Sequence, residues 1–175
     1  MDNGFEPEEI RHFIKDVPNY PQEGVIFKDI APLLLSPTAL QSVCNELACY
    51  GRQATLVAGI EARGFIFGSL VANILGVGFV PLRKPGKLPR ETYRVSYELE
   101  YGNGELEMHT DAVTQSDSVF LIDDVLATGG TAEAGTHLIE KAGGRVSSIA
   151  FVIEIEFLGG KKRLMDYPVT TLLTY

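Results

Sequence analysis

Short apolar segments that alternate with helix-like segments constrain the fold of this chain more than any other feature of its sequence. Continuous apolar runs are typical of strands that are covered on both faces, as in a parallel sheet. The four runs are Thr55–Ile60, Gly78–Leu82, Val119–Ile122 and Val146–Ile155. Helices are predicted to begin near Gly64 and to span Gly130–Ala142. Buried strands that alternate with helices predict an α/β fold with a largely parallel central sheet flanked by helices.

The first fifty residues have weaker patterns. Residues 6–15 predict a short amphipathic helix with its apolar side chains on one side. Thr38–Tyr50 predicts a second helix, because Pro37 suits the first turn of a helix. The segment between them, Tyr20–Leu35, is interrupted by prolines and a glycine and is expected to be irregular.

A hairpin and a basic segment lie between the second and third apolar runs. Residues 92–109 alternate polar and apolar side chains around Gly102-Asn103-Gly104, which predicts an antiparallel hairpin appended to the main sheet. Residues 83–94 lead into it and hold five of the chain's 15 basic residues. We expect residues 83–104 to form a mobile lid that closes over an anion and excludes water. The alternative is a solvated basic loop that offsets an acidic surface.

Length and charge limit the functions that the chain can have. Its 175 residues suit a single domain over residues 1–175. The net charge of −8 argues against nucleic acid or an anionic membrane surface as a partner, so an anionic ligand needs a local site. The uncharged stretch Phe65–Leu82 is better explained by a buried helix and strand than by a membrane span. Without an apolar export signal or a CxxC pair (the cysteines are Cys44 and Cys49), we expect a cytoplasmic protein with reduced thiols.

The segment Val119–Thr131 predicts an anion-binding loop. An apolar strand ends in Asp123 and Asp124, and small residues then lead into a helix. Backbone N–H groups of small residues can surround a phosphate, to which the helix N-terminus adds partial positive charge. An ordinary strand-to-helix turn leaves the two adjacent carboxylates unexplained, whereas a ligand with hydroxyls or a divalent cation accounts for them. The loop has neither the Lys of a Walker A sequence nor a GxGxxG pattern, which disfavours ATPase, kinase and simple dinucleotide-binding functions.

This segment resembles the phosphoribosyl diphosphate (PRPP) motif of type I phosphoribosyltransferases, with four apolar residues, two acids, two variable residues and a small-Thr-Gly-Gly-Thr loop. Three further segments narrow this resemblance from the superfamily to one family. They are Tyr20–Ile30, Gly59–Gly68 and Arg83–Gly102. In this order and spacing they resemble the adenine phosphoribosyltransferase family over nearly the whole chain. The resemblance implies that adenine and PRPP give AMP and pyrophosphate, with Mg²⁺ carried on PRPP, no metal ligands supplied by the protein, and a homodimer.

The resemblance assigns residues of two strand-end loops to PRPP. Asp123 and Asp124 would bind the ribose hydroxyls and balance the charge that develops at C1, although Asp124 alone could be a buried cap. Arg63, in the loop after the first strand, would bind pyrophosphate as a catalytic residue, and its alternative is a salt bridge to Glu61. The 5′-phosphate would be held by Ala127, Thr128, Gly129, Gly130 and Thr131.

The remaining predicted site residues would contact pyrophosphate and the base. From the lid, Arg83, Lys84 and Lys87 would bind PRPP. Glu100 would act as the acid/base group near N7 of adenine, since the motif favours it over Glu98 on the same strand face. Its alternative is an exposed hairpin carboxylate.

The adenine ring is assigned to an early segment. Main-chain groups of Ile26, Phe27 and Lys28 would read the base edge, and the Phe27 ring could stack on it. Core packing is the alternative for Phe27.

Two other classes of function stay open at this point. One is a hypoxanthine/guanine or orotate transferase that shares only the phosphate loop. The segment Ile26–Asp29 together with Glu100 distinguishes it from an adenine transferase, because the elements that read the base vary while the phosphate loop does not. The other is a PRPP-sensing regulator without catalysis, which the net charge of −8 and the lack of a basic DNA-binding module disfavour.

Overall fold

A five-stranded sheet organises the larger of the two units into which the chain divides, Leu47–Tyr175; the smaller unit is Met1–Glu46. The computed structural model describes residues 7–98 and 103–175. The strands of the sheet stand in the order β4-β3-β7-β8-β9, and each strand runs parallel to its neighbours. Their bounds are β3 Leu56–Ile60, β4 Gly78–Leu82, β7 Ser118–Leu126, β8 Arg145–Glu154 and β9 Val169–Thr174. The predicted α/β class with a parallel central sheet is confirmed.

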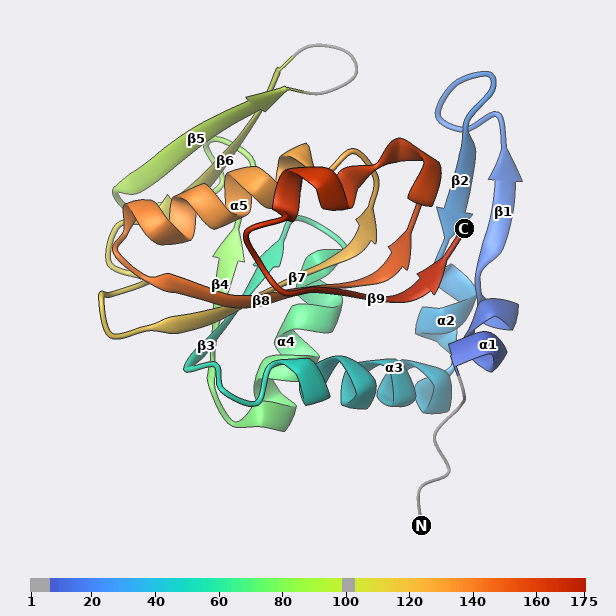
Figure 1. Ribbon diagram of the computed structural model, residues 1–175, viewed down its shortest axis with the longest axis horizontal. Coiled ribbons are helices and arrows are strands. Elements are labelled where there is room, and N and C mark those ends of the chain that lie inside the picture. The colour runs from blue at the N-terminus through green and yellow to red at the C-terminus, as the bar shows by residue number, and fades with distance from the viewer. Residues whose placement is uncertain (1–6, 99–102) are drawn as a thin grey trace. The chain divides into compact units, whose positions relative to one another are not determined.

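Helices cover both faces of this sheet (Figure 1). On one face, α4 (Gly64–Leu75) packs on β3 and β7. On the other lies α5 (Gly130–Lys141), which also contacts the hairpin strands β5 (Thr92–Glu98) and β6 (Asn103–His109). The helices beginning near Gly64 and at Gly130 are therefore confirmed. Because the crossover helices enclose the strands, the sheet is buried on both sides and its carboxyl edge is left for the loops.

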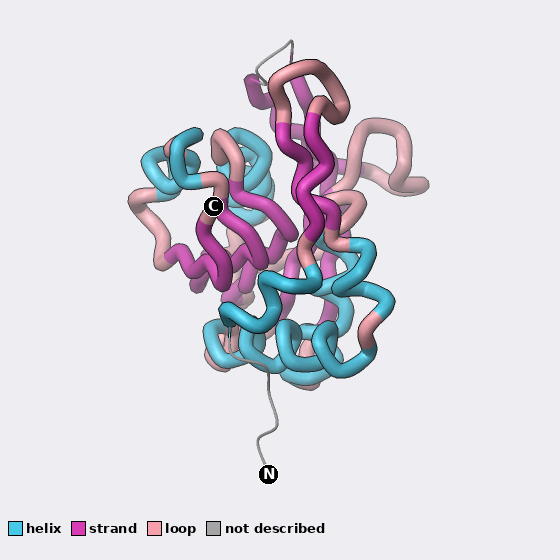
Figure 2. Tube along the Cα trace, turned by 90° about the vertical axis from the view of Figure 1, so that its right-hand side faces the viewer, coloured by secondary structure: helices cyan, strands magenta, loops and turns pink. Residues whose placement is uncertain are grey.

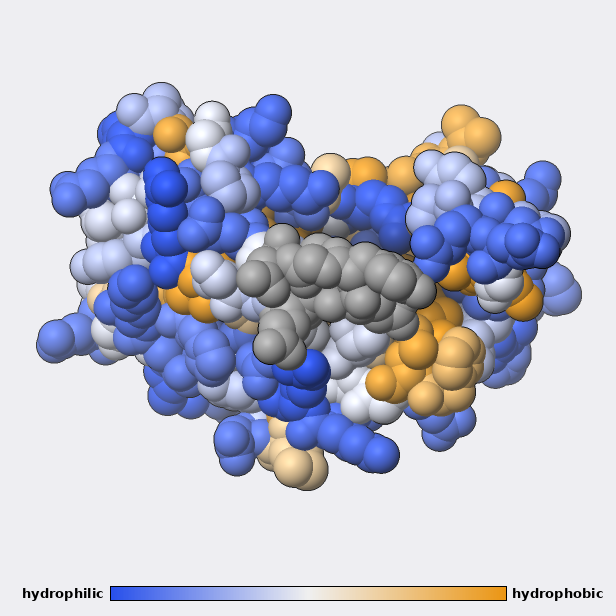
Figure 3. Space-filling model, turned by 90° about the horizontal axis from the view of Figure 1, so that it is seen from above, coloured by the Kyte–Doolittle hydropathy of each residue, from blue (hydrophilic) through white to orange (hydrophobic). Residues whose placement is uncertain are grey.

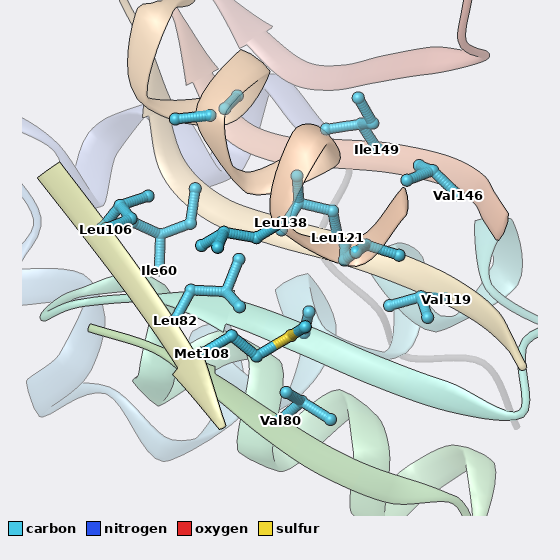
Figure 4. Packing of buried hydrophobic residues seen from close by; sticks show 14 of the residues in the cluster. Ile60, Val80, Leu82, Leu106, Met108, Val119, Leu121, Leu138, Val146 and Ile149 are labelled. Atoms are coloured by element: carbon cyan, nitrogen blue, oxygen red, sulfur yellow. The ribbon is translucent and has the colours of Figure 1, made fainter. Parts of the chain in front are cut away.

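The hairpin forms a separate two-stranded antiparallel sheet, as predicted, but it also closes the core. Leu106 and Met108 of β6 are at most 1% exposed and belong to the same apolar cluster as Leu82 and Leu138 (Figure 4). Buried apolar contact at Leu106 and Met108 therefore fixes this part of the hairpin to the main body, and the removal of that surface from water stabilises it.

The end of β7 and the last elements of the larger unit differ from the sequence prediction. β7 continues beyond Ile122 to Leu126, so both aspartates lie within the strand, where Asp123 is opposite Phe151 of β8. The strand continues because its ladder with β8 does not depend on apolar side chains. The sequence also did not predict β9 or the two 3₁₀ turns that precede it, η2 (Glu156–Leu158) and η3 (Gly160–Leu164).

The smaller unit departs further from the prediction. Its elements are α1 Pro7–Ile10, η1 Arg11–Phe13, β1 Lys15–Pro18, β2 Ile26–Asp29, α2 Ala31–Leu35 and the start of α3 Pro37–Tyr50. The helix predicted over residues 6–15 is wrong at its end, because Lys15 pairs with Asp29 in an antiparallel ladder. The expected irregular segment is also wrong, since it holds β2 and α2; Figure 2 shows β1 and β2 side by side. The helix predicted from Thr38 to Tyr50 is confirmed.

The face seen in Figure 3 is mostly hydrophilic, with apolar residues gathered in smaller patches. Among the described residues, no helix has the length and apolar character to cross a membrane. Cys44 is buried, Cys49 is exposed, and neither forms a disulfide.

Candidate active site

The loop between β7 and α5 surrounds a cavity of about 70 Å³ at the carboxyl edge of the sheet. This is the edge at which open α/β sheets bind their ligands. The cavity is lined by Asp123, Val125, Leu126, Ala127, Thr128, Gly129, Thr131, Ala132 and Phe151. The structure therefore brings together most of the residues that the sequence assigned to the phosphate and the ribose.

The turn of the loop depends on Gly129, the N-cap residue of α5. Gly129 has φ 85°, a left-handed conformation that costs little for glycine and much for other residues. There is also no room for a side chain at this position, because a Cβ on Gly129 would lie 2.5 Å from the carbonyl oxygen of Gly160. No side chain caps the N-terminus of α5, so the helix presents its first backbone N–H groups and its partial positive charge there. Such a loop is built to receive an anion.

Two carboxylates stand beside this loop in β7. Asp124 is 5% exposed and Asp123 is half-buried, and the Asp124 N–H donates to Oδ1 of Asp123 over 2.9 Å. Burial raises the pKa of Asp123 well above its usual range, and the neighbouring Asp124 charge raises it further. Burial also raises the pKa of Asp124, against the opposing effect of the Arg63 guanidinium. Negative charge is thus held here at a cost in folding free energy, as is common at functional sites.

Arg63 lies next to the aspartates at the start of α4. Its Nε is 2.7 Å from Oδ2 of Asp124, an ion pair different from the alternative one with Glu61. The approach of α4 to β7 depends on Gly64, because a Cβ at this position would lie 2.8 Å from Oδ1 of Asp123. The residues that the sequence assigned to pyrophosphate and to ribose are therefore in direct contact.

Glu61 instead binds the beginning of the basic segment. Its two carboxylate oxygens accept from Nε and Nη2 of Arg83, each over 3.1 Å, and the Lys84 N–H donates to one of them over 3.0 Å. The hydrogen bonds from Arg83 hold the pKa of Glu61 below its usual value. The peptide bond between Glu61 and Ala62 is cis. This bidentate pair fixes Arg83 beside the loop that carries Arg63.

The other basic side chains of residues 83–94 divide into two groups. Arg90 pairs with Asp111, and Arg94 pairs with the buried Glu107 at 2.7 Å. Within the described part of the chain, no hydrogen bond or ion pair is formed by the side chains of the exposed Lys84 and Lys87. An anion can therefore bind these two lysines without displacing a carboxylate from them.

The residues predicted to bind adenine are in the smaller unit. Ile26, Phe27 and Lys28 form β2, whose Lys28 donates to Asp16 over 2.6 Å. The ring of Phe27 packs edge-on against Tyr20 with their centroids 5.2 Å apart. β2 belongs to a two-stranded sheet, so one of its edges pairs with no strand of the described chain. The other predicted catalytic residue, Glu100, lies outside the described residues.

Comparison with known proteins shows the family to which this chain belongs. Residues 35–172 match the phosphoribosyl transferase domain family. The chain is also 52% identical over 170 residues to an adenine phosphoribosyltransferase of Nitrosococcus oceani, covering 96% of this chain and 99% of that protein. The chain belongs to the adenine phosphoribosyltransferase family.

Solved structures of adenine phosphoribosyltransferases share the fold. That of Thermoanaerobacter pseudethanolicus has a TM-score of 0.94 at 48% identity, covering 97% of this chain and 99% of that one. The Saccharomyces cerevisiae enzyme, solved with an imino-altritol bisphosphate and adenine, has a TM-score of 0.91 at 36% identity, covering 95% and 97% of the two chains. The resemblance found in the sequence motifs is confirmed.

Two features of the site escaped the sequence analysis. Gly160, behind the phosphate loop, and Glu61, as the partner of Arg83, are both brought to the site by contacts far apart in the sequence. The only local signal for the first was the Gly159-Gly160 pair, which the strand and helix patterns did not involve.

Proposed function

We propose that this chain transfers the 5-phosphoribosyl group of PRPP to N9 of adenine and releases AMP and pyrophosphate, a reaction of purine salvage. The observation that carries the proposal is its 52% identity to an adenine phosphoribosyltransferase over 96% of the chain. In the reaction the bond between C1 and the pyrophosphate oxygen breaks, a bond between C1 and N9 forms, and adenine gives up a proton.

The 5′-phosphate of PRPP binds to the loop Ala127–Thr131. The uncapped N-terminus of α5 supplies backbone N–H donors and partial positive charge, and Thr128 and Thr131 add hydroxyl donors. Support for this assignment comes from the cavity that these residues line and from the left-handed Gly129 at its turn.

Asp123 and Asp124 accept hydrogen bonds from the ribose hydroxyls. As the bond to pyrophosphate breaks, positive charge develops at C1, and two fixed carboxylates stabilise this charge without having to reorganise. Arg63 binds the pyrophosphate as a bidentate donor. The 2.7 Å contact between Arg63 and Asp124 supports the assignment of these two residues to neighbouring groups of one substrate.

The basic segment supplies the remaining positive charge for pyrophosphate. Arg83 is held by Glu61, and the exposed Lys84 and Lys87 are available to the ligand. As a lid, residues 83–104 exclude water, which would otherwise capture the positively charged centre and hydrolyse PRPP. Mg²⁺ enters with PRPP as part of the substrate, since its preferred oxygen ligands are those of the pyrophosphate and ribose.

The base is bound by main-chain groups of Ile26, Phe27 and Lys28, and Phe27 offers a ring face to adenine. Glu100 accepts the proton at N7 as N9 attacks. We further propose that the protein is a cytoplasmic homodimer, the state implied by the family resemblance.

The test is an incubation of the protein with PRPP, Mg²⁺ and each of adenine, hypoxanthine, guanine and orotate, followed by nucleotide detection. A site that pairs with polar edges of the base rejects analogues that leave its groups unpaired, by a factor of roughly 10⁴. We expect AMP from adenine and far slower conversion of the other bases. Comparable rates with adenine and hypoxanthine would refute the proposed specificity.

A further inference from the structure

The turn η3 lies directly behind the phosphate loop. A Cβ at Gly160 would be 2.3 Å from the carbonyl oxygen of Ala127 and 3.1 Å from the backbone nitrogen of Gly129. In the other direction, a Cβ at Gly129 would be 2.5 Å from the carbonyl oxygen of Gly160. The two backbone segments therefore approach closely on the side of the loop made by Ala127 and Gly129, and Cδ1 of Leu126 lies beside them, 2.8 Å from the Cβ position of Gly160.

This turn is itself firmly held. Leu164 at its end is fully buried in the core cluster. Lys161 Nζ is 2.5 Å from Oε2 of Glu154, a carboxylate 5% exposed at the end of β8, and Glu154 also accepts from the Thr171 hydroxyl over 2.9 Å. Near the first turn of α5, Arg163 pairs with Glu133 at 3.0 Å. The turn is thus tied to β8, the neighbour of β7 in the sheet, and to α5, the helix that follows the phosphate loop.

Within the described residues, the loop itself offers few side chains that could fix its position. Its residues are small, and no side chain caps α5. Small residues allow a phosphate to approach, but they provide few side-chain contacts that could hold the backbone donors in one geometry. A support made of backbone on the far side meets this need without filling the cavity.

We propose that Gly160 is a positioning residue for the phosphate loop, and that the Lys161–Glu154 ion pair holds it in place. The inference rests on the proposed function, because it concerns the loop assigned to the 5′-phosphate. Moving the loop weakens the binding of every ligand with a 5′-phosphate. It leaves the binding of pyrophosphate unchanged, because pyrophosphate is bound by Arg63 and the basic segment. A merely structural role would instead alter the binding of both ligands together.

The experiment measures dissociation constants for AMP and for Mg²⁺-pyrophosphate by calorimetry, with steady-state kinetics for PRPP. For Gly160→Ala we expect AMP binding to weaken and the KM for PRPP to rise, each by roughly ten- to a hundredfold, because displacements near 1 Å have effects of this size. The affinity for pyrophosphate should stay within about twofold of the wild type, since its contacts are not displaced. Gly159→Ala is the matched control: Gly159 has φ 67° and would be strained by a side chain, but its Cβ would meet nothing closer than 3.7 Å. It should lower the Tm and leave AMP affinity unchanged.

Lys161→Met provides a second variant, because Lys161 is 46% exposed and its loss does not fill the core. It should weaken AMP more than pyrophosphate, and Lys161→Arg should restore binding. If Gly160→Ala fails to fold, the Lys161 variants decide the matter in the same way. If it folds and loses both ligands alike, the role of Gly160 is merely structural and the proposal is overturned. Wild-type AMP affinity in Gly160→Ala, or an unchanged ratio of AMP to pyrophosphate affinity in Lys161→Met, would overturn the proposal. A wild-type protein that binds neither AMP nor PRPP would refute the proposed function, and this inference with it.

Discussion

Replacing Asp123 by Asn should stabilise the protein while impairing its reaction. Burial and the adjacent Asp124 raise the pKa of Asp123, so the folded protein favours the protonated acid. The contribution of this carboxyl to the free energy of unfolding is greatest below its unfolded pKa of about 4 and is lost as the pH rises through the folded value. Asn stays neutral and avoids this loss.

The expected gain follows from the charges at the site. Two carboxylates share one guanidinium, that of Arg63, whose Nε lies 2.7 Å from Oδ2 of Asp124. The Asn side-chain oxygen can still accept the 2.9 Å hydrogen bond from the Asp124 N–H. We expect about 1–2 kcal/mol of added stability at pH 7, the upper part of the range of roughly 0.5–2 kcal/mol for favourable single substitutions. For a chain of this length, that corresponds to a rise in Tm of roughly 2–8 °C.

Urea unfolding of both proteins from pH 4 to pH 8 measures the effect. The advantage of Asp123→Asn should be small near pH 4 and grow toward neutral pH, while kcat/KM falls. Asp117→Asn is the control of opposite sign, because hydrogen bonds from Thr114 hold the pKa of Asp117 below its usual value. Its stability deficit should be full at pH 7 and nearly constant down to pH 4, because the unfolded pKa of about 4 and the lower folded pKa both lie at or below the end of this range. If Asp123→Asn is less stable than the wild type at pH 7, or its advantage is independent of pH, the reasoning about the buried pair is refuted.

Two further predictions concern the lid. Glu100→Gln should lower kcat by roughly 10²–10⁴-fold with little change in PRPP affinity, as for a lost acid/base group, whereas Glu98→Gln should have little effect; equally mild effects of both in steady-state assays would remove the catalytic assignment. Lys87→Ala should raise the KM for PRPP with kcat nearly unchanged, because a charge on pyrophosphate acts in the ground and transition states alike; a fall in kcat alone would contradict this role.

The parts of the fold that the sequence predicts are those that depend on local patterns. Buried strands such as Leu56–Ile60 carry continuous apolar runs, and the phosphate loop follows its strand directly along the chain. By contrast, β1 and β2 were missed because their residues are mostly polar or exposed and are strands only through pairing with each other. β7 was ended too early at Ile122, since the aspartates looked like the start of a loop.

The sequence predicts which charged residues lie at the site, but it does not predict which of them form ion pairs with each other. Sequence neighbours suggested a pair between Arg63 and Glu61, whereas the parallel alignment of β3 with β4 and β7 brings Arg63 to Asp124 and Glu61 to Arg83. Gly160 was missed for the same reason, because its contact with Ala127 exists only after β8 has added to the sheet. Such contacts depend on strand order, which local patterns do not specify.

The central claim is that the loop Ala127–Thr131 binds PRPP for transfer to adenine. Its most direct test is the amount of AMP and pyrophosphate formed from PRPP, Mg²⁺ and adenine by the wild type, Gly129→Ala and Gly76→Ala. Both glycines have positive φ, 85° and 69°, so each substitution costs about 1–2 kcal/mol in backbone strain. Only Gly129 has backbone within 4 Å of the added Cβ, whereas Gly76 has no neighbour there. The account predicts equimolar AMP and pyrophosphate from the wild type and Gly76→Ala, and a rate lower by about a hundredfold for Gly129→Ala. No AMP from the wild type, or equal rates for the two variants, would contradict it.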